Sequence, residues 1–463
     1  MSENSIVRAL TGSRKNYKLI HDAYNGAGGY ADGSYLEQYA REAAEDYERR
    51  KRMAYFANYV KPIVNGSVDP IFREYPSRDC KSNNELWAAF LNNCDGKGSS
   101  LDRFIKKAAL QAKLDGSVFL FMENAREADI AANLETAIRE RQYPYLFRIA
   151  QKDVINYSVD RFDRLLLFCY QRTYDELADD GKVLTVSESW KWTPNTWEVT
   201  RNGVKTEGVH KLGVIPVIPL IGSDTTDEEE GDKLKPQSDF VQAVKVNNAL
   251  YNACSELRQR NRGQAFSLLT YGIPDDANPS EFKEMLTGVN NALMYKGNNA
   301  PNWITPDQAP SDMLQEEIKM LVEVMYRMAD RVSVTGVQEQ KSGVAKEWDN
   351  LARMQSLSEF SKACEAAEYR IADIFGAYIN QKLDVLIKYA EGFGVTDTKS
   401  ALDEITAALE LQIGGKFDVA VKKKAARIVL KDEDDAVISE VSKDIEKLAE
   451  NEAYDNDGDD DKE

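Results

Sequence analysis

The chain has 463 residues, of which 43% are hydrophobic and 29% are charged, so it is long enough to bury a large core or several domains. Its 59 Lys and Arg against 77 Asp and Glu give a formal net charge of -18, which excludes a protein that wraps nucleic acid by bulk attraction but allows DNA contacts through a few placed cations. No apolar run reaches the ~18 residues of a membrane span, and the first residues lack the apolar core of a signal peptide, so we expect the chain to stay in the cytoplasm where it is made.

The first quarter of the chain predicts helices. Residues 34–66 are dense in Glu, Arg, Tyr and Ala and read as one helix. Two more helices are expected at about 84–93 and 100–114, and Ser99 or Ser100 is the expected N-cap of the second.

The periodicity changes after Gly116. Short apolar runs separated by turn residues predict an antiparallel, β-rich region over residues 117–222. The acidic stretch 225–236 ends at a proline and predicts a linker. The β-rich region holds a cluster of tryptophans, for which cross-strand packing is favoured over stacking on bases: Trp190, Trp192 and Trp197.

Helical periodicity returns at Ser238 and continues to about residue 262. About 45 mixed residues follow and predict a small α/β insert, with a short helix near residues 280–291. A clean apolar stripe then predicts a helix over 311–332. From Trp348 onwards one apolar face repeats for so long that a helix of about 40 residues, spanning about 60 Å, is expected. The end of the chain reads as a strand-like ELQI at 410–413, a helical tail and a disordered acidic terminus.

Few residues carry recognisable chemistry. The five cysteines are scattered and form no CxxC pair, so we expect reduced and mostly buried thiols. His21 and His210 are the only histidines, which argues against a zinc site or a His-dependent triad. Residues 26–31 match the dinucleotide-binding spacing, but no apolar strand precedes them, so a flexible loop is favoured. We therefore expect no catalytic residue, no metal and no cofactor.

Two sets of residues on the later helices are open to more than one interpretation. The apolar stripe of 311–332 fits either an ordinary core or a contact between subunits. The basic residues on or beside the two helices that flank the insert either pair with nearby acids or bind a polyanion. Those of the first helix are expected on the side opposite its apolar face. This basic set comprises Lys245, Arg258, Arg260, Arg262, Lys319, Lys341 and Lys346.

Three stretches, together with the order of the helices and strands predicted above, give the chain a resemblance to the portal proteins of tailed bacteriophages. YFANYVKPIVNGSVDPIF (55–72) resembles the early helix and following turn of that family, and DGSVFLFME (115–123) resembles its glycine-led strand. SGVAKEWD (342–349) resembles its junction between a loop and the long helix. The resemblance covers nearly the whole chain and includes no catalytic signature.

The resemblance implies an α+β, mainly helical portal fold whose copies assemble as a dodecameric ring around a channel. The implied regions are a wing over 1–235, a first stem helix over 236–265, a clip over 266–309, a second stem helix over 310–335, a tunnel loop over 336–347, a long helix returning through the wing over 348–415, and a crown with an acidic tail over 416–463. Double-stranded DNA would pass through the channel during packaging and ejection.

The resemblance also implies partners and roles. The partners would be terminase, the major capsid and scaffolding proteins, and head-completion or tail adaptor proteins, at the portal vertex of the virion after assembly in the host cytoplasm. The tunnel loop would face DNA through Gln338, Gln340, Lys341, Ser342 and Lys346. The channel would be lined from the stem by Lys245, Arg258, Arg260, Arg262 and Lys319. Subunits would pack through Leu314, Ile318, Leu321, Met325, Met328 and Trp348.

Two other classes of function fit the sequence less well. A metal-dependent nucleotidyl or glycosyl transferase needs convergent carboxylates, and no pair stands out in a chain this acidic. A helical scaffold without DNA needs only protein-binding helices. Annular particles in purified material would favour the portal protein. A compact monomer with metal-dependent activity would favour the enzyme, and filaments or sheets would favour the scaffold.

Overall fold

The computed structural model divides the chain into two units, Met1–Phe393 and Gly394–Glu463. It describes residues 13–448 with the exception of 83, 125–133, 178–180, 224–233, 265–267, 274–291, 298–299, 301, 305–306, 329–342, 391–392, 394–397, 412, 431–436, 438–439 and 446. None of the helices in these residues is long and apolar enough to cross a membrane.

The first unit opens with four short helices: α1 (Ser13–Asn25), α2 (Gly29–Asp32), α3 (Ala44–Met53) and α4 (Val60–Asn65). The single helix predicted over 34–66 is wrong, because residues 34–43 and 54–59 are not helical. The side chain of Arg50, 1% exposed, explains the first break. Its guanidinium donates to the Glu42 carboxylate at 2.8 Å and to the Glu37 carbonyl, so the preceding segment folds around it rather than continuing the helix.

Residues 26–31, which match the dinucleotide spacing, comprise the link between α1 and α2 and the first three residues of α2. They follow a helix instead of a strand, so the structural context of a cofactor fingerprint is absent there. The glycines serve packing: Gly28 has φ +54°, and a Cβ at this position would overlap the Asp22 carboxylate.

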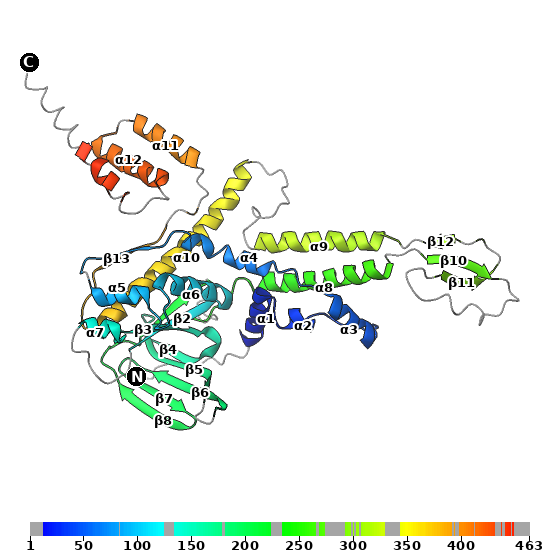
Figure 1. Cartoon of the computed structure of the whole chain (residues 1–463), viewed down its shortest axis with the longest axis horizontal. Helices are drawn as coiled ribbons and strands as arrows, with labels where there is room; N and C mark the ends of the chain where they lie inside the picture. Colours follow the sequence, from blue (N-terminus) through cyan, green and yellow to red (C-terminus); the bar gives the residue numbers. More distant parts are fainter. Residues whose placement is uncertain are drawn as a thin grey trace, which may run out of the picture. The chain divides into compact units, whose positions relative to one another are not determined.

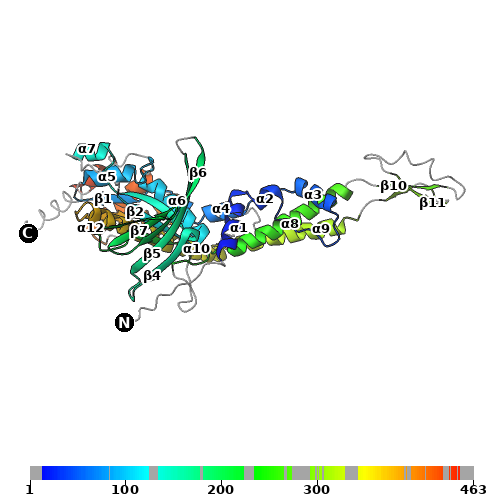
Figure 2. The same cartoon turned by 90° about the horizontal axis from the view of Figure 1, so that it is seen from below.

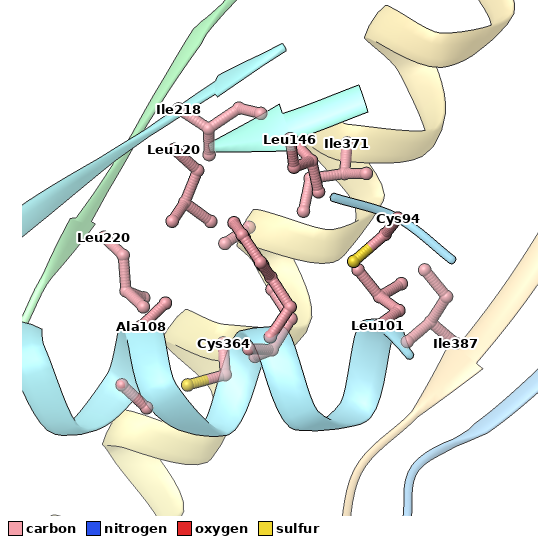
Figure 3. Packing of buried hydrophobic residues seen from close by; sticks show 14 of the residues in the cluster. Cys94, Leu101, Ala108, Leu120, Leu146, Ile218, Leu220, Cys364, Ile371 and Ile387 are labelled. Carbon is pink, nitrogen blue, oxygen red and sulfur yellow. The ribbon is translucent and has the colours of Figure 1, made fainter. Parts of the chain in front are cut away.

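The main core joins the predicted helices α5 (Glu85–Asn92) and α6 (Leu101–Asp115) to the sheet β3-β2-β9 and to α10 (Gly343–Tyr378) (Figure 3). The strands are β2 (Ser117–Glu123), β3 (Tyr145–Ala150) and β9 (Val217–Ile221), and both neighbours of β2 run antiparallel to it. Every residue of β2 except Glu123 is buried, as expected of a central strand covered on both faces. Ser100 caps α6, accepting a bond from the Arg103 amide at 3.4 Å, which confirms the second of the two candidate caps.

A small sheet and a short 3₁₀ helix complete this core. The 3₁₀ helix is η1 (Asp69–Phe72), and the sheet pairs β1 (Ser77–Cys80) with β13 (Val385–Lys388) in antiparallel register. Residues Ser77 and Lys388 are partners at one end and Cys80 and Val385 at the other, so the chain just after α10 returns beside a strand from the first hundred residues.

The predicted β-rich region is confirmed as an antiparallel sheet in the order β4-β5-β6-β7-β8. Its strands are β4 (Val154–Val159), β5 (Leu165–Leu177), β6 (Val183–Trp192), β7 (Thr196–Arg201) and β8 (Val204–Val209). The tryptophans pack across strands, as expected: Trp192 is paired with Trp197, and Trp190 and Trp192 are 7% and 3% exposed.

Two antiparallel helices and a small sheet form the extended part of the first unit (Figures 1 and 2). The helices are α8 (Val241–Gln264) and α9 (Ala309–Met328), close to the predicted ranges. Between them in sequence lie β10 (Leu268–Ile273), β11 (Ala292–Lys296) and β12 (Asn302–Ile304). The strand order in this sheet is β11-β10-β12, in which β10 is parallel to β11 and antiparallel to β12. The helix expected near 280–291 lies outside the described residues.

The second unit holds α11 (Thr398–Glu410) and α12 (Gly415–Val429), which pack on each other. The expected boundary at 415/416 falls inside this unit, whose first residue is Gly394. The strand-like ELQI begins with the last helical residue of α11 and continues into a turn, so that expectation is wrong for the residues described there. All five cysteines are free and Cys94, Cys254 and Cys364 are buried, which confirms the reduced, mostly buried thiols.

Candidate functional site

The antiparallel pair α8–α9 is the candidate site, because it carries five of the seven predicted basic residues and five of the six predicted packing residues. A hydrophobic cluster holds the pair together and joins it to α1, α2 and α4; Met325 of α9 and Leu250 of α8 are 0% and 1% exposed. Tyr251 of α8 packs edge-on against Tyr30 and Phe56, so aromatic contacts fix one side of α8 to the N-terminal helices.

Tyr59 sets the register between the two helices. Its amide donates to Asn247 Oδ1 on α8 at 3.2 Å, and its ring lies edge-on to that of Tyr326 on α9, with ring centroids 6.0 Å apart. Asn247 and Tyr326 therefore lie at about the same level along the pair. Asn247 is fully buried and also donates to the Ala57 carbonyl at 3.1 Å, so the level is held by satisfied polar contacts.

The basic residues of α8 do not share one face, which corrects the prediction that all four lie opposite the apolar stripe. Arg258 lies over the ring of Tyr55 at 5.5 Å, and Arg262 Nη1 approaches the Met53 sulfur at 3.2 Å. Both therefore face the N-terminal segment. Lys245, thirteen positions before Arg258, is about 140° away from it around a helix of 3.6 residues per turn and is exposed.

Arg260 differs from its neighbours. It lies about 60° from Lys245 around the helix axis, is half-buried, and its Nε is shielded from solvent without a hydrogen-bond partner in the part of the chain described. Lys319 on α9 is exposed. That any of these cations lines a channel stays a prediction.

The apolar stripe of α9 is largely accounted for within one chain. Ile318, Leu321 and Met325 belong to the cluster shared with α8, and Leu314 is half-buried. Met328 is instead 52% exposed. A role for these residues between subunits stays a prediction.

The loop residues cannot be placed in the same way. Gln338, Gln340, Lys341 and Ser342 lie outside the described residues. Lys346 and Trp348 lie within the backbone range of α10, which begins at Gly343, and their side chains are outside the description.

A buried ionic cluster holds α10 in the main core. Arg78 of β1 donates from Nε and Nη2 to both oxygens of Glu368 on α10 at 2.6 and 2.7 Å, and from Nη1 to Asp102 of α6 at 2.6 Å. Tyr389 Oη donates to the same Glu368 at 2.5 Å. Burial lowers the pKa of Arg78, but the bonds to Glu368 outweigh it, so that pKa is raised and the guanidinium stays charged.

Sequence reasoning missed this cluster because Arg78 and Glu368 are 290 positions apart. The only local signal was a glutamate on the otherwise apolar face of a long helix. Such a residue needs a buried partner, but nothing in the sequence says which one.

A second buried carboxylate ties α1 to α6. His21 Nε2 lies 2.6 Å from Asp115 Oδ1, and Gln111 Nε2 donates to the other oxygen at 3.2 Å. Burial raises the pKa of Asp115, and the bond with His21 opposes that rise. A cavity of about 470 Å³ next to this pair is lined by Tyr17, Lys18, His21, Asp22, Lys152, Asp153, Ile155, Gln171 and Thr173. Within the described residues, no three His, Cys, Asp or Glu side chains are grouped to hold a metal ion.

No protein-family model and no curated protein matches the sequence. Among solved structures, the chain is similar to a chain in the virion of a native gene transfer agent particle, with 13% sequence identity and a TM-score of 0.45 over 90% of this chain and 95% of that one. It is also similar to a chain in the neck of an empty gene transfer agent particle computed with C6 symmetry, with 12% identity and a TM-score of 0.39 over 86% and 89% of the two chains. At these scores neither match carries an argument about function.

Proposed function

We propose that the protein is the portal protein of a tailed phage or phage-like particle, a dodecameric ring that conducts double-stranded DNA at one vertex of the capsid. The observation that carries the proposal is the order of elements in the first unit. A mixed core leads into α8, then a small sheet, then α9 antiparallel to α8, and after residues 329–342 a 36-residue helix that runs back into the same core. This order supports the succession of wing, stem, clip, stem and long helix that the sequence resemblance implies.

The helix pair suits a stem because it is both long and braced. A helix of 24 residues such as α8 is about 36 Å long at 1.5 Å per residue. The N-terminal helices brace one side through Tyr251 and Asn247. Copies of such a pair arranged around an axis would make a wall of helices, with the sheet β11-β10-β12 at one end as the docking surface for terminase and for head-completion or tail adaptor proteins.

The charge suits a channel that must let DNA slide. At a net charge of -18 the chain repels a duplex on average, and a few exposed cations provide weak contacts that salt screens. In the proposed ring, residues 336–347 narrow the channel. Lys341, Ser342 and Lys346 would then offer polar contacts to phosphates, each too weak to arrest the duplex.

Negative-stain imaging of the purified chain, combined with a mass measurement in solution, tests this proposal. Annular particles with a central hole wide enough for duplex DNA are expected. A compact monomer with metal-dependent activity would favour the transferase alternative, and filaments or sheets would favour a scaffold. Absence of rings under any condition, or rings with residues 236–347 on the outer rim, contradicts the portal assignment.

A further inference from the structure

One edge of α9 is apolar and uncovered. Met313, Met320 and Met328 are 70%, 55% and 52% exposed, whereas Ile318, Leu321, Val322, Met325 and Tyr326 belong to the cluster shared with α8. Steps of seven and eight residues are close to two helical turns, so the three side chains lie along one side of the helix. We call this set the methionine edge. Methionine adapts to irregular partner surfaces, and a row of three in water is unfavourable unless something covers it.

An acidic ridge runs beside the methionine edge. Asp312, Glu316 and Glu323 are exposed and follow steps of four and seven along α9. Glu323 has Arg327 at 4.0 Å, whereas Asp312 and Glu316 form no ion pair within the described residues. Lys319 is the one cation between Glu316 and Glu323, so the ridge as a whole is negative.

The open side of α8 has the opposite character. The N-terminal segment covers the side of Tyr251, Cys254 and Arg258, and it also bonds to Asn252 through Tyr35 and Glu37. Leu250 lies on the side of α8 whose hydrophobic cluster is shared with α9. The remaining side carries Lys245 and Arg260, with Ala249, exposed and small, between them. Glu256 also points this way but already bonds to Tyr39, and together with burial this raises the pKa of that phenol. Glu256 keeps its negative charge, because the phenol that bonds to it is neutral, so the two cations Lys245 and Arg260 leave this side with a small net positive charge.

The register brings the opposite charges to one level. Asn247 and Tyr326 are level because Tyr59 contacts both. Arg260 lies thirteen positions after Asn247, and thirteen positions before Tyr326 is Met313, so Arg260 is level with Met313 and within about one turn of Asp312 and Glu316. A rotation about an axis parallel to the helices preserves these levels from one copy to the next.

We infer that a second copy of this chain covers the methionine edge with the open side of its α8, so that Arg260 of the partner subunit meets Asp312 and Glu316. Lys245 of the partner subunit is level with Met328 and can cover it with its methylene stem. The inference rests on the proposed ring and names the contact that closes it. The two faces belong to one helix pair but differ in charge and composition, so the contact is heterologous, the type that forms rings.

A mixing experiment with two charge-reversed variants tests the contact in trans. Arg260→Glu and the double variant Asp312→Lys/Glu316→Lys are each expected to raise the concentration needed for assembly at least tenfold. An equimolar mixture should assemble as the wild type does, because alternating subunits restore opposite charges at every contact. Mass photometry of the separate and mixed samples gives the readout. Arg258→Glu is the matched control, since this residue faces the N-terminal segment, and it should change assembly less than twofold.

The outcomes separate this inference from the proposed function. If the wild type forms rings but the variants assemble normally, or the mixture fails to recover, another partner covers the methionine edge and the inference is overturned. If the wild type forms no rings, the proposed function fails first. Thermal melting of each monomer checks folding. Should a charge reversal unfold the chain, Arg260→Gln and Asp312→Asn/Glu316→Gln replace the reversed variants. These are expected to shift the assembly midpoint in the same direction by a smaller amount, and an unchanged midpoint would overturn the inference.

Discussion

The chain uses charged side chains in two contrasting ways. In the main core, Arg78 is bonded to Glu368 and Asp102, and the side chains of Arg78 and Glu368 are 8% and 0% exposed. On the helix pair, Arg260 and Glu316 form no ion pair with any described residue. The first set is satisfied within one chain and holds the later part of α10 in the core. We infer that a second copy of the chain supplies the partners of the second set.

The largest expected effect comes from breaking the buried set. Glu368→Ala leaves the Arg78 guanidinium buried with Asp102 alone, and the loss of one partner from a buried ion pair costs about 3–5 kcal/mol in the free energy of unfolding. Urea titration followed by circular dichroism measures it. Glu359→Ala, an exposed site on the same helix, should change the value by less than about 0.5 kcal/mol. Similar losses in the two variants would erase the distinction between the regions.

A pH titration examines the second buried carboxylate. Burial raises the pKa of Asp115 in the folded chain, so the folded state binds a proton more readily than the unfolded state just above the usual aspartate range. In that window the contribution of Asp115 to stability falls as pH rises, by no more than about 1.4 kcal/mol per pH unit for one group. The difference in unfolding free energy between the wild type and Asp115→Asn should shift in favour of the variant as pH rises through the window. A difference independent of pH contradicts a raised pKa.

The contrast between the regions also marks what sequence could predict. Apolar periodicity located α6, α8, α9 and α10, since a helix that buries one face must repeat apolar residues every three or four positions. The same reasoning missed α1 and joined α3 to α4. It also extended the predicted helix back to residue 34, where Arg50 overrides local helical preference by recruiting Glu42 and the Glu37 carbonyl. Contacts between distant residues, such as Arg78 with Glu368, leave no local pattern to find.

The candidate site divides along the same line. Spacing located the basic residues of α8, but it did not reveal that Arg258 and Arg262 face Tyr55 and Met53. That outcome depends on where residues 54–59 pass, which is a tertiary property. Exposure on α9, in contrast, follows from the helix period once the side that packs on α8 is known. Met325 lies on the packed side, whereas the methionine edge is exposed.

A smaller effect is expected from neutralising the unsatisfied set. Arg260→Gln should change the unfolding free energy of the monomer by less than about 0.5 kcal/mol, because it removes no ion pair made with the described residues. Assembly of the same variant should weaken measurably. Urea titration at a concentration below assembly, beside mass photometry above it, separates the two quantities. A loss of monomer stability as large as that of Glu368→Ala would mean that Arg260 is part of the scaffold.

The smallest effect on stability belongs to Lys341→Ala, which lies outside the described residues and is argued from sequence. Removing one exposed cation per chain should leave folding and ring assembly unchanged, because exposed charges contribute little to either. In the proposed channel it removes a weak phosphate contact from every subunit, so DNA packaging or retention should fall several-fold at low salt. The deficit should shrink as salt rises, since the screening length is only about 10 Å at 0.1 M. Lys97→Ala, an exposed lysine just before α6, is the matched control, and a normally filled genome in the Lys341→Ala particle would remove the loop from the mechanism while leaving the ring intact.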